Sequence, residues 1–132
     1  MSCLLDQWGP EKLQAHFKSI QAFYKSKRDC MLAAAELHLK GLAEWYVPPA
    51  GMFLWITVAG IKDTNKLITE GGMQQGVILL PGKHFMVDPE KPSPHFRASY
   101  TVATPDEINT VSNCIVTLKR LKIINWCCKL SI

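Results

Sequence analysis

A single arginine stands in an otherwise uncharged stretch in the second half of the chain. Arg97 lies within residues 95–100, where aromatic and small side chains alternate as in a β-strand. Pro92 and Pro94 come just before and favour an extended backbone. A guanidinium keeps its proton, so an arginine in a buried strand needs an anionic partner. That partner is either an internal Asp or Glu, which is the simpler explanation, or an anion that arrives with a ligand.

A second group of charges lies at residues 25–28, with the sequence Lys-Ser-Lys-Arg. Basic residues in the middle of an amphipathic helix usually form its solvated face, and this is the interpretation we favour. Phosphate binding is the alternative. Neither a glycine-rich loop nor a helix N-terminus is present at these residues to support it.

Composition limits the class of protein. The chain has 132 residues, of which 48% are hydrophobic, enough for one modest domain with its own core. The net charge of +4 comes from scattered basic residues mixed with 11 acidic ones, which does not indicate a nucleic-acid-binding protein. The first residues lack the pattern of a signal peptide, and no apolar run approaches the roughly 20 residues that span a bilayer.

The cysteines and histidines do not form a recognisable site. The five cysteines are odd in number and irregularly spaced, which favours a reducing compartment over a disulfide scaffold. The four histidines lie far from one another and from any Cys-x-x-Cys pair, so no zinc site is expected.

The N-terminal part is expected to be one long helix. Pro10 suits a first helical turn, and Gly41 suits the position after the last one. Between them runs an apolar stripe at helical spacing, formed by Leu13, Phe17, Ile20 and Tyr24. A helix of about 30 residues would be roughly 45 Å long. That is long for so small a domain, so we expect part of its packing partner to be absent.

Two strands are expected next, at residues 42–47 and 52–58, joined by a loop because Pro48 and Pro49 prevent a tight hairpin. Trp45 and Trp55 are most simply core aromatics. Phe53 follows the loop directly and is a candidate for the rim of a pocket, although a core position is the default for any aromatic residue.

The middle of the chain predicts a short helix capped by Asp63 or Thr64 and weakened by its Gly71-Gly72 pair. The continuous apolar run at residues 77–80 predicts a strand covered on both faces. A proline-rich loop at residues 83–94 then leads into Arg97, and long stiff loops are often functional.

The last element has the clearest local signal. Thr104, Pro105 and Glu107 form a capping box around the start of a helix, and apolar residues then recur at helical spacing. The predicted fold is therefore an α/β or α+β sandwich. A long N-terminal helix and further helices pack on a small, mostly buried sheet of about four strands. We divide the chain into a linking helix (residues 1–41), a small domain (42–124) and a poorly specified tail (125–132).

Three segments carry a resemblance to a known family. They are Ala-Gly-Met-Phe-Leu-Trp at residues 50–55, Leu-Leu-Pro-Gly at 79–82 and Pro-Ser-Pro-His-Phe-Arg-Ala-Ser at 92–99. In order and spacing they resemble the C-terminal small domain of fold-type I aminotransferases that depend on pyridoxal 5′-phosphate (PLP). Together with Gly-Leu-Ala-Glu-Trp at residues 41–45, they are most similar to the kynurenine/2-aminoadipate type. The resemblance extends over residues 5–108 and fades after Asn109, and the Gly71-Gly72 pair departs from it.

The resemblance assigns roles to three residues. It implies that Arg97 binds the α-carboxylate of an amino-acid or 2-oxo-acid substrate through a bidentate salt bridge, for which a planar guanidinium is suited. It also implies that Phe53 borders the pocket for the substrate side chain, and that Phe85 does so more weakly. Holding the carboxylate presents the amine of the substrate to the cofactor in a reactive geometry.

The same resemblance implies that the catalytic groups are elsewhere. PLP chemistry needs a Schiff-base lysine, a carboxylate at the pyridine nitrogen and a phosphate cradle, all of which belong to the large domain in this family. No lysine here lies in the family's Ser-x-Ser-Lys setting. We therefore expect no catalytic residue, no bound PLP and no activity in this chain alone.

The resemblance leaves three functional hypotheses. The chain is a partial aminotransferase completed by a large domain, an interaction module that pairs with a full-length aminotransferase subunit, or a sensor of amino or 2-oxo acids. A homodimer is a further expectation of the family. Nucleic acid and membrane are not expected partners, and the expected location is the cytoplasm or mitochondria.

Overall fold

The computed structural model describes residues 2–129, with side chains for residues 7–118 and 120. Helix α1 (Ser2–Leu39) contains one residue outside helical geometry, Gly9, with φ 66° and ψ 170°. Pro10 follows this break and restarts the helix, because a first-turn residue needs no backbone N–H donor. Gly41 then ends α1 with φ +74°. The predicted end of the long helix is confirmed. Its predicted start coincides with the break at Gly9, but residues 2–8 are helical as well.

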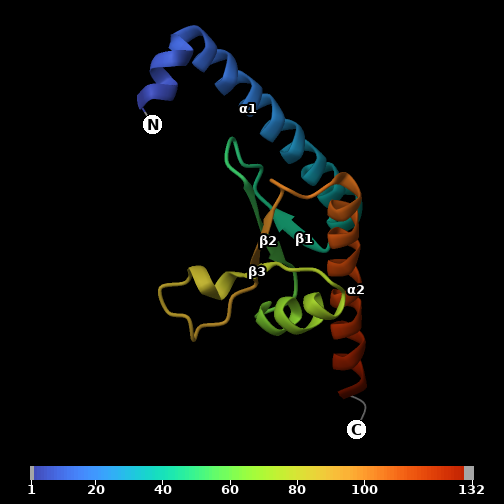
Figure 1. Ribbon diagram of the computed structural model, residues 1–132. Helices are drawn as coiled ribbons and strands as arrows, with labels where there is room; N and C mark the ends of the chain where they lie inside the picture. The colour runs from blue at the N-terminus through green and yellow to red at the C-terminus, as the bar shows by residue number, and fades with distance from the viewer. Residues whose placement is uncertain (1, 130–132) are drawn as a thin grey trace.

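Among the described side chains of α1, the fully buried ones lie in its second half. Its buried residues are Met31, Ala34, Ala35 and Leu39. The N-terminal part of the helix extends beyond the sheet (Figure 1). Phe17 and Phe23 of α1 are 52% and 53% exposed. As the sequence indicated, the helix is longer than the domain it covers.

The sheet has four antiparallel strands in the order β1-β2-β4-β3. They are β1 (Ala43–Trp45), β2 (Phe53–Val58), β3 (Leu80–Pro81) and β4 (His95–Ser99). Strands β2 and β4 form its centre, and their register pairs Trp55 with Arg97 and Thr57 with His95. The predicted fold class, a small sheet with helices packed on it, is confirmed.

Alternation along β2 and β4 gives the sheet one buried and one open face. Leu54, Ile56 and Val58 of β2 are each 1% exposed, and they share the core with Phe96 and Ala98 of β4. Phe53 and Trp55 point the other way and are 39% and 36% exposed. Burial is therefore confined to one face of β2, and the expectation that Trp55 is a core residue was wrong.

Helix α2 (Pro105–Lys129) begins as the capping box predicts. The backbone N–H of Thr104 donates to Glu107 Oε2 over 2.7 Å, and the N–H of Glu107 donates to Thr104 Oγ1 over 3.3 Å. The helix packs against α1 and continues to Lys129, so residues 125–129 of the predicted tail are helical. Residues 130–132 lie outside the described part of the chain.

The predicted short helix contains a π-helical turn, η1 (Leu67–Gly72). Asp63 Oδ1 accepts a hydrogen bond from the N–H of Asn65, which agrees with the expected cap. A Cβ at Gly71 would lie 2.6 Å from Leu118 Cδ2 of α2, and one at Gly72 would lie 2.9 Å from the carbonyl oxygen of Val77. The glycine pair therefore allows a close approach of α2 and of the following chain.

The strand expected at residues 77–80 was largely wrong. Only Leu80 of this run joins the sheet, where it begins β3 together with Pro81, and Ile78 is 92% exposed. Val77 is buried against Leu67 and Leu118 in a small separate cluster. A short 3₁₀-helix, η2 (Gly82–Phe85), follows β3 and begins the long loop.

Candidate functional site

Arg97 lies on the open face of the sheet, in the middle of β4. Its neighbours across the strands are Trp55 on β2 and Leu80 on β3. The side chain is half-buried, and the guanidinium carbon lies 3.9 Å from the ring centroid of Phe53 and 4.7 Å from that of Phe85. The structure thus brings together the three residues for which the sequence predicted a joint role.

The guanidinium has no acidic partner among the described side chains, whose ion pairs are Arg28–Asp29, Lys40–Glu36 and Lys91–Asp88. Of the two partners that the sequence left open for Arg97, the internal acid is therefore not found in this part of the chain. Aromatic faces stabilise the cation, by about 0.5–1 kcal/mol at exposed sites. Stacking uses the flat face of a guanidinium, so its N–H groups can still bind a carboxylate.

The turn before β2 places Phe53. Gly51 adopts φ +104°, and its carbonyl oxygen accepts a hydrogen bond of 2.8 Å from the hydroxyl of Tyr100. The N–H of Tyr100 donates to the carbonyl oxygen of Met52 over 3.2 Å. Tyr100 is 1% exposed, so a buried residue just after β4 fixes the backbone from which Phe53 projects.

A close backbone approach places Phe85. A Cβ on Gly82 would lie 2.5 Å from Ser93 Oγ and 2.7 Å from the carbonyl oxygen of His95. Glycine therefore lets η2 lie against the start of β4, which brings Phe85 at the end of η2 close to Arg97. This contact accounts for a glycine directly before the predicted functional loop.

Three further residues of the open face were missed from the sequence. Trp55 contacts Phe85 edge-on, with centroids 5.2 Å apart and an interplanar angle of 83°. It also stacks on His95, with centroids 5.5 Å apart and an angle of 30°. Thr57 Oγ1 lies 2.9 Å from Nδ1 of His95. The period-two alternation that places Phe53 outward places Trp55 and Thr57 on the same face, so the signal was present.

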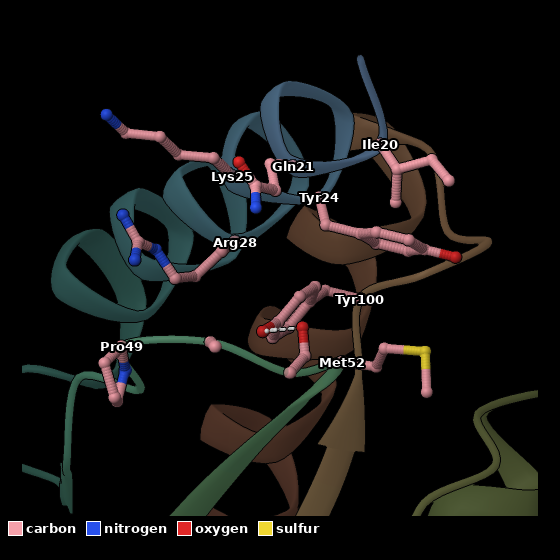
Figure 2. Close-up of a pocket in the computed structure, with 10 residues that line it drawn as sticks. Ile20, Gln21, Tyr24, Lys25, Arg28, Pro49, Met52 and Tyr100 are labelled. Atoms are coloured by element: carbon pink, nitrogen blue, oxygen red, sulfur yellow. Dashed lines mark hydrogen bonds between the residues drawn. The ribbon is translucent and has the colours of Figure 1, made fainter. Parts of the chain in front are cut away.

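A cavity of about 440 Å³ lies between α1 and the turn before β2 (Figure 2), and its lining does not include Arg97. Arg28 faces it but is already engaged, since Nη2 lies 2.7 Å from Asp29 Oδ1 and Nη1 donates to the carbonyl oxygen of Pro48 over 3.3 Å. Burial raises the pKa of Tyr100, and the nearby Arg28 partly opposes this shift. The lining residues are Ile20, Gln21, Tyr24, Lys25, Arg28, Pro49, Ala50, Gly51, Met52 and Tyr100.

The basic stretch at residues 25–28 is solvated only in part. Lys25 is exposed as expected. Lys27 instead donates through Nζ to the carbonyl oxygen of Ala103 over 2.7 Å, and Arg28 holds the loop at Pro48. Both side chains thus connect α1 to the loops that flank β2 and β4, which agrees better with a structural role than with phosphate binding.

Other classes of site find no support in the described part of the chain. No group of three or more potential metal ligands occurs among those residues. None of the helices within residues 2–129 is both long and apolar enough to cross a membrane. Cys30 and Cys114 are free thiols, and burial raises the pKa of Cys114.

No protein-family model matches the chain. Similar proteins were found nevertheless. Over 107 residues, 81% of this chain, it is 51% identical to the mitochondrial kynurenine/alpha-aminoadipate aminotransferase of Mus musculus. Over 111 residues, 84% of the chain, it is 50% identical to the same enzyme of Rattus norvegicus. The matched regions are 25% and 26% of those two proteins, so the chain spans about a quarter of their length.

The chain is a partial domain of a fold-type I aminotransferase. Solved structures agree with this assignment. A kynurenine aminotransferase from Pyrococcus horikoshii superposes with a TM-score of 0.74 at 30% identity, over 83% of this chain and 27% of that one. A multiple substrate aminotransferase from Thermococcus profundus gives a TM-score of 0.76 at 28% identity, over 86% and 28%. The predicted resemblance is confirmed.

The surroundings of Arg97 do not fit the cofactor of this aminotransferase family. PLP requires a lysine for the Schiff base and a carboxylate at its pyridine nitrogen. The described side chains of this open face supply aromatic rings, an imidazole and a hydroxyl instead, from Phe53, Trp55, Phe85, His95 and Thr57.

Proposed function

We propose that this domain supplies the substrate-carboxylate clamp of an aminotransferase of the kynurenine/2-aminoadipate type. Arg97 binds the α-carboxylate of an amino acid or 2-oxo acid, Phe53 borders the substrate side chain, and Phe85 does so to a lesser extent. The position of the Arg97 guanidinium over these two rings carries the proposal. It holds a planar cation at an open surface while leaving its N–H groups for a planar anion.

The reaction itself requires the part of the enzyme that the matched relatives have and this chain does not span. PLP, the Schiff-base lysine and the phosphate cradle would all be supplied by a large domain, as the resemblance implies. The chain alone is then inactive. Mixing it with an equimolar amount of PLP should leave the cofactor's absorbance spectrum unchanged, and transamination by the chain unaided would refute this part of the proposal.

The clamp is tested by nuclear magnetic resonance (NMR) with 2-oxoglutarate and kynurenine as probes. Each is titrated into the ¹⁵N-labelled chain, and the Nε–H signal of Arg97 is followed. We expect shifts centred on Arg97 and saturation with ligand. Arg97→Lys keeps the charge but loses the planar fork, so affinity should fall about tenfold or more.

Arg120→Lys is the matched control, because Arg120 is an exposed arginine on α2 that should leave binding unchanged. Equal weakening by both lysine variants, or ligand shifts that do not involve Arg97, would contradict the clamp.

The exposed apolar residues of α1 favour an additional role in assembly. Phe17, Ile20 and Phe23 are 52%, 37% and 53% exposed, and Ile20 also lines the cavity between α1 and the turn before β2. An uncovered row of this kind is typical of a surface that packs on another polypeptide. We propose that a large domain or a full-length aminotransferase subunit covers it. Co-elution with such a subunit in size-exclusion chromatography tests this, and separate elution would rule it out.

A further inference from the structure

The position of Arg97 on the open face needs an explanation beyond its two phenylalanine contacts. Trp55 is its direct partner across β2 and β4. Tryptophan attracts a guanidinium more strongly than phenylalanine does. Among the described residues, however, the rings that Arg97 contacts are those of Phe53, at 3.9 Å, and Phe85, at 4.7 Å. Something on this face keeps the guanidinium away from the better ring.

His95 is placed to do this. It lies diagonally across from Trp55 on the same face, and the two rings stack at 5.5 Å with an interplanar angle of 30°. Phe85 meets Trp55 edge-on at 5.2 Å. An imidazole lying over the indole covers a face that a guanidinium would otherwise use, because both bind the same π-surface.

A hydrogen bond holds the imidazole in this position. Thr57 pairs with His95 across the strands, and its Oγ1 lies 2.9 Å from Nδ1 of the ring. A ring with a polar anchor at one edge and a stacking partner on its face has little freedom to rotate. The order of contacts is therefore Thr57 to His95, His95 to Trp55, Trp55 to Phe85, and Phe85 to Arg97.

We propose that His95 is a positioning residue for the carboxylate clamp. Held by Thr57, it occupies a face of Trp55 and so leaves the Arg97 guanidinium over Phe53 and Phe85. This inference rests on the proposed function for its biological meaning. Its physical content, the location of the arginine side chain, can be measured without any ligand.

The decisive comparison is between His95→Val and His95→Phe. Both residues favour strands, but only phenylalanine restores a ring over Trp55. Nuclear Overhauser effects (NOEs) from the Arg97 δ-protons should reach the rings of Phe53 and Phe85 in the original chain and in His95→Phe. In His95→Val they should move to the indole of Trp55. Unchanged NOEs in His95→Val would overturn the proposal.

Thr57 gives a second test that leaves the histidine in place. Thr57→Val keeps the branched shape but removes the hydroxyl, whereas Thr57→Ser keeps the hydroxyl. Thr57→Val should shift the NOEs partly toward Trp55, and Thr57→Ser should not. If His95→Val does not give the amide spectrum of a folded chain, the two Thr57 variants test the positioning role of His95 instead. Identical NOEs in Thr57→Val and Thr57→Ser would then count against the proposal.

Titration with 2-oxoglutarate separates this inference from the proposed function. We expect binding to weaken about two- to fivefold in His95→Val and to recover in His95→Phe, as the energy of one cation–π contact suggests. If the original chain shows no shift at Arg97 but the NOEs still move, the clamp fails and the positioning role stands. If the original chain binds through Arg97 and the NOEs of the His95 and Thr57 variants do not move, the positioning role fails and the clamp stands.

Discussion

The two faces of β2 and β4 are formed by alternate residues of the same two strands, and their chemistry differs. On the inner face, Leu54, Ile56 and Phe96 are 0–1% exposed and pack on the helices. On the outer face, Phe53, Trp55 and Arg97 are only partly covered: Arg97 lies over Phe53, and Trp55 contacts Phe85 and His95. A single alternation of side chains thus puts the buried core on one face of the sheet and the residues of the proposed clamp on the other.

The largest expected effect is on the inner face. Phe96→Ala removes a ring that is 0% exposed and should lower the free energy of unfolding by about 3–5 kcal/mol. Phe53→Ala removes the same ring from the outer face and should cost about 1 kcal/mol or less, since that ring is 39% exposed. Urea denaturation measures both. Similar losses of unfolding free energy in the two variants would mean that the outer face contributes to stability as much as the inner face does.

A smaller effect is expected at Gly82, where η2 meets β4. Gly82→Ala places a methyl group 2.7 Å from a backbone carbonyl oxygen, so the backbone must move. We expect a loss of about 1–3 kcal/mol, as for other overpacked sites, together with weaker 2-oxoglutarate binding as Phe85 shifts. Lys83→Ala, one residue further along η2, is the control. If Gly82→Ala alters stability without altering binding, Phe85 is not part of the clamp.

The N-terminal cap of α2 should stabilise a helix that packs on the inner face of the sheet, away from the open face. Thr104→Ala should lower the free energy of unfolding by about 0.5–2 kcal/mol, because it removes the side-chain oxygen that accepts from the N–H of Glu107. Thr104→Ser should retain most of the stability. Ligand titration of Thr104→Ala should give the affinity of the original chain, and a reduced affinity would show that the two faces are coupled.

The same cap should make the stability of the fold depend on pH in the acidic range. Hydrogen bonds from the backbone N–H and then the hydroxyl of Thr104 lower the pKa of Glu107. A carboxyl with a lowered pKa in the folded state stabilises the fold at pH values above its unfolded pKa of about 4.3, and this contribution disappears as the pH falls through the folded value. The stability difference between the original chain and Glu107→Gln should therefore shrink on acidification below about pH 5. A difference that grows there would contradict the assignment.

The smallest change in stability is expected at Arg97 itself. Arg97→Met keeps much of the side-chain volume and loses only stacking on two partly exposed rings, so the free energy of unfolding should change by about 1 kcal/mol or less. Binding of 2-oxoglutarate should nevertheless disappear. A large loss of stability would place Arg97 with the inner face and would remove the contrast between the two faces.

Local signals in the sequence were sufficient for the elements that depend on local physics. The capping box at Thr104 and the helix end at Gly41 are confirmed because each needs only backbone geometry and a neighbouring side chain. The apolar run at residues 77–80 failed because apolar content cannot show whether a partner strand is available. In the structure Val77 packs on Leu118, a contact 41 positions away in the chain that no local pattern indicates.

The candidate site was likewise predicted only in part, because some of its contacts are long-range. Phe53, Phe85 and Arg97 came from the resemblance, and the structure brings them together. Trp55 and His95 were missed, since an aromatic residue is assigned to the core by default and a lone histidine carries little signal. Their pairing depends on the register of β2 with β4, which is a long-range property.

The bare row of Phe17, Ile20 and Phe23 also bears on the life of this chain in a cell. Chaperones and proteases act on polypeptides that display uncovered aromatic and aliphatic groups, even when the remainder is well folded. The half-life of the protein would then follow the supply of a covering partner more closely than its own melting temperature. If the proposed partner covers these residues, synthesis in excess of it would end in turnover, and the abundance of the chain would depend on assembly.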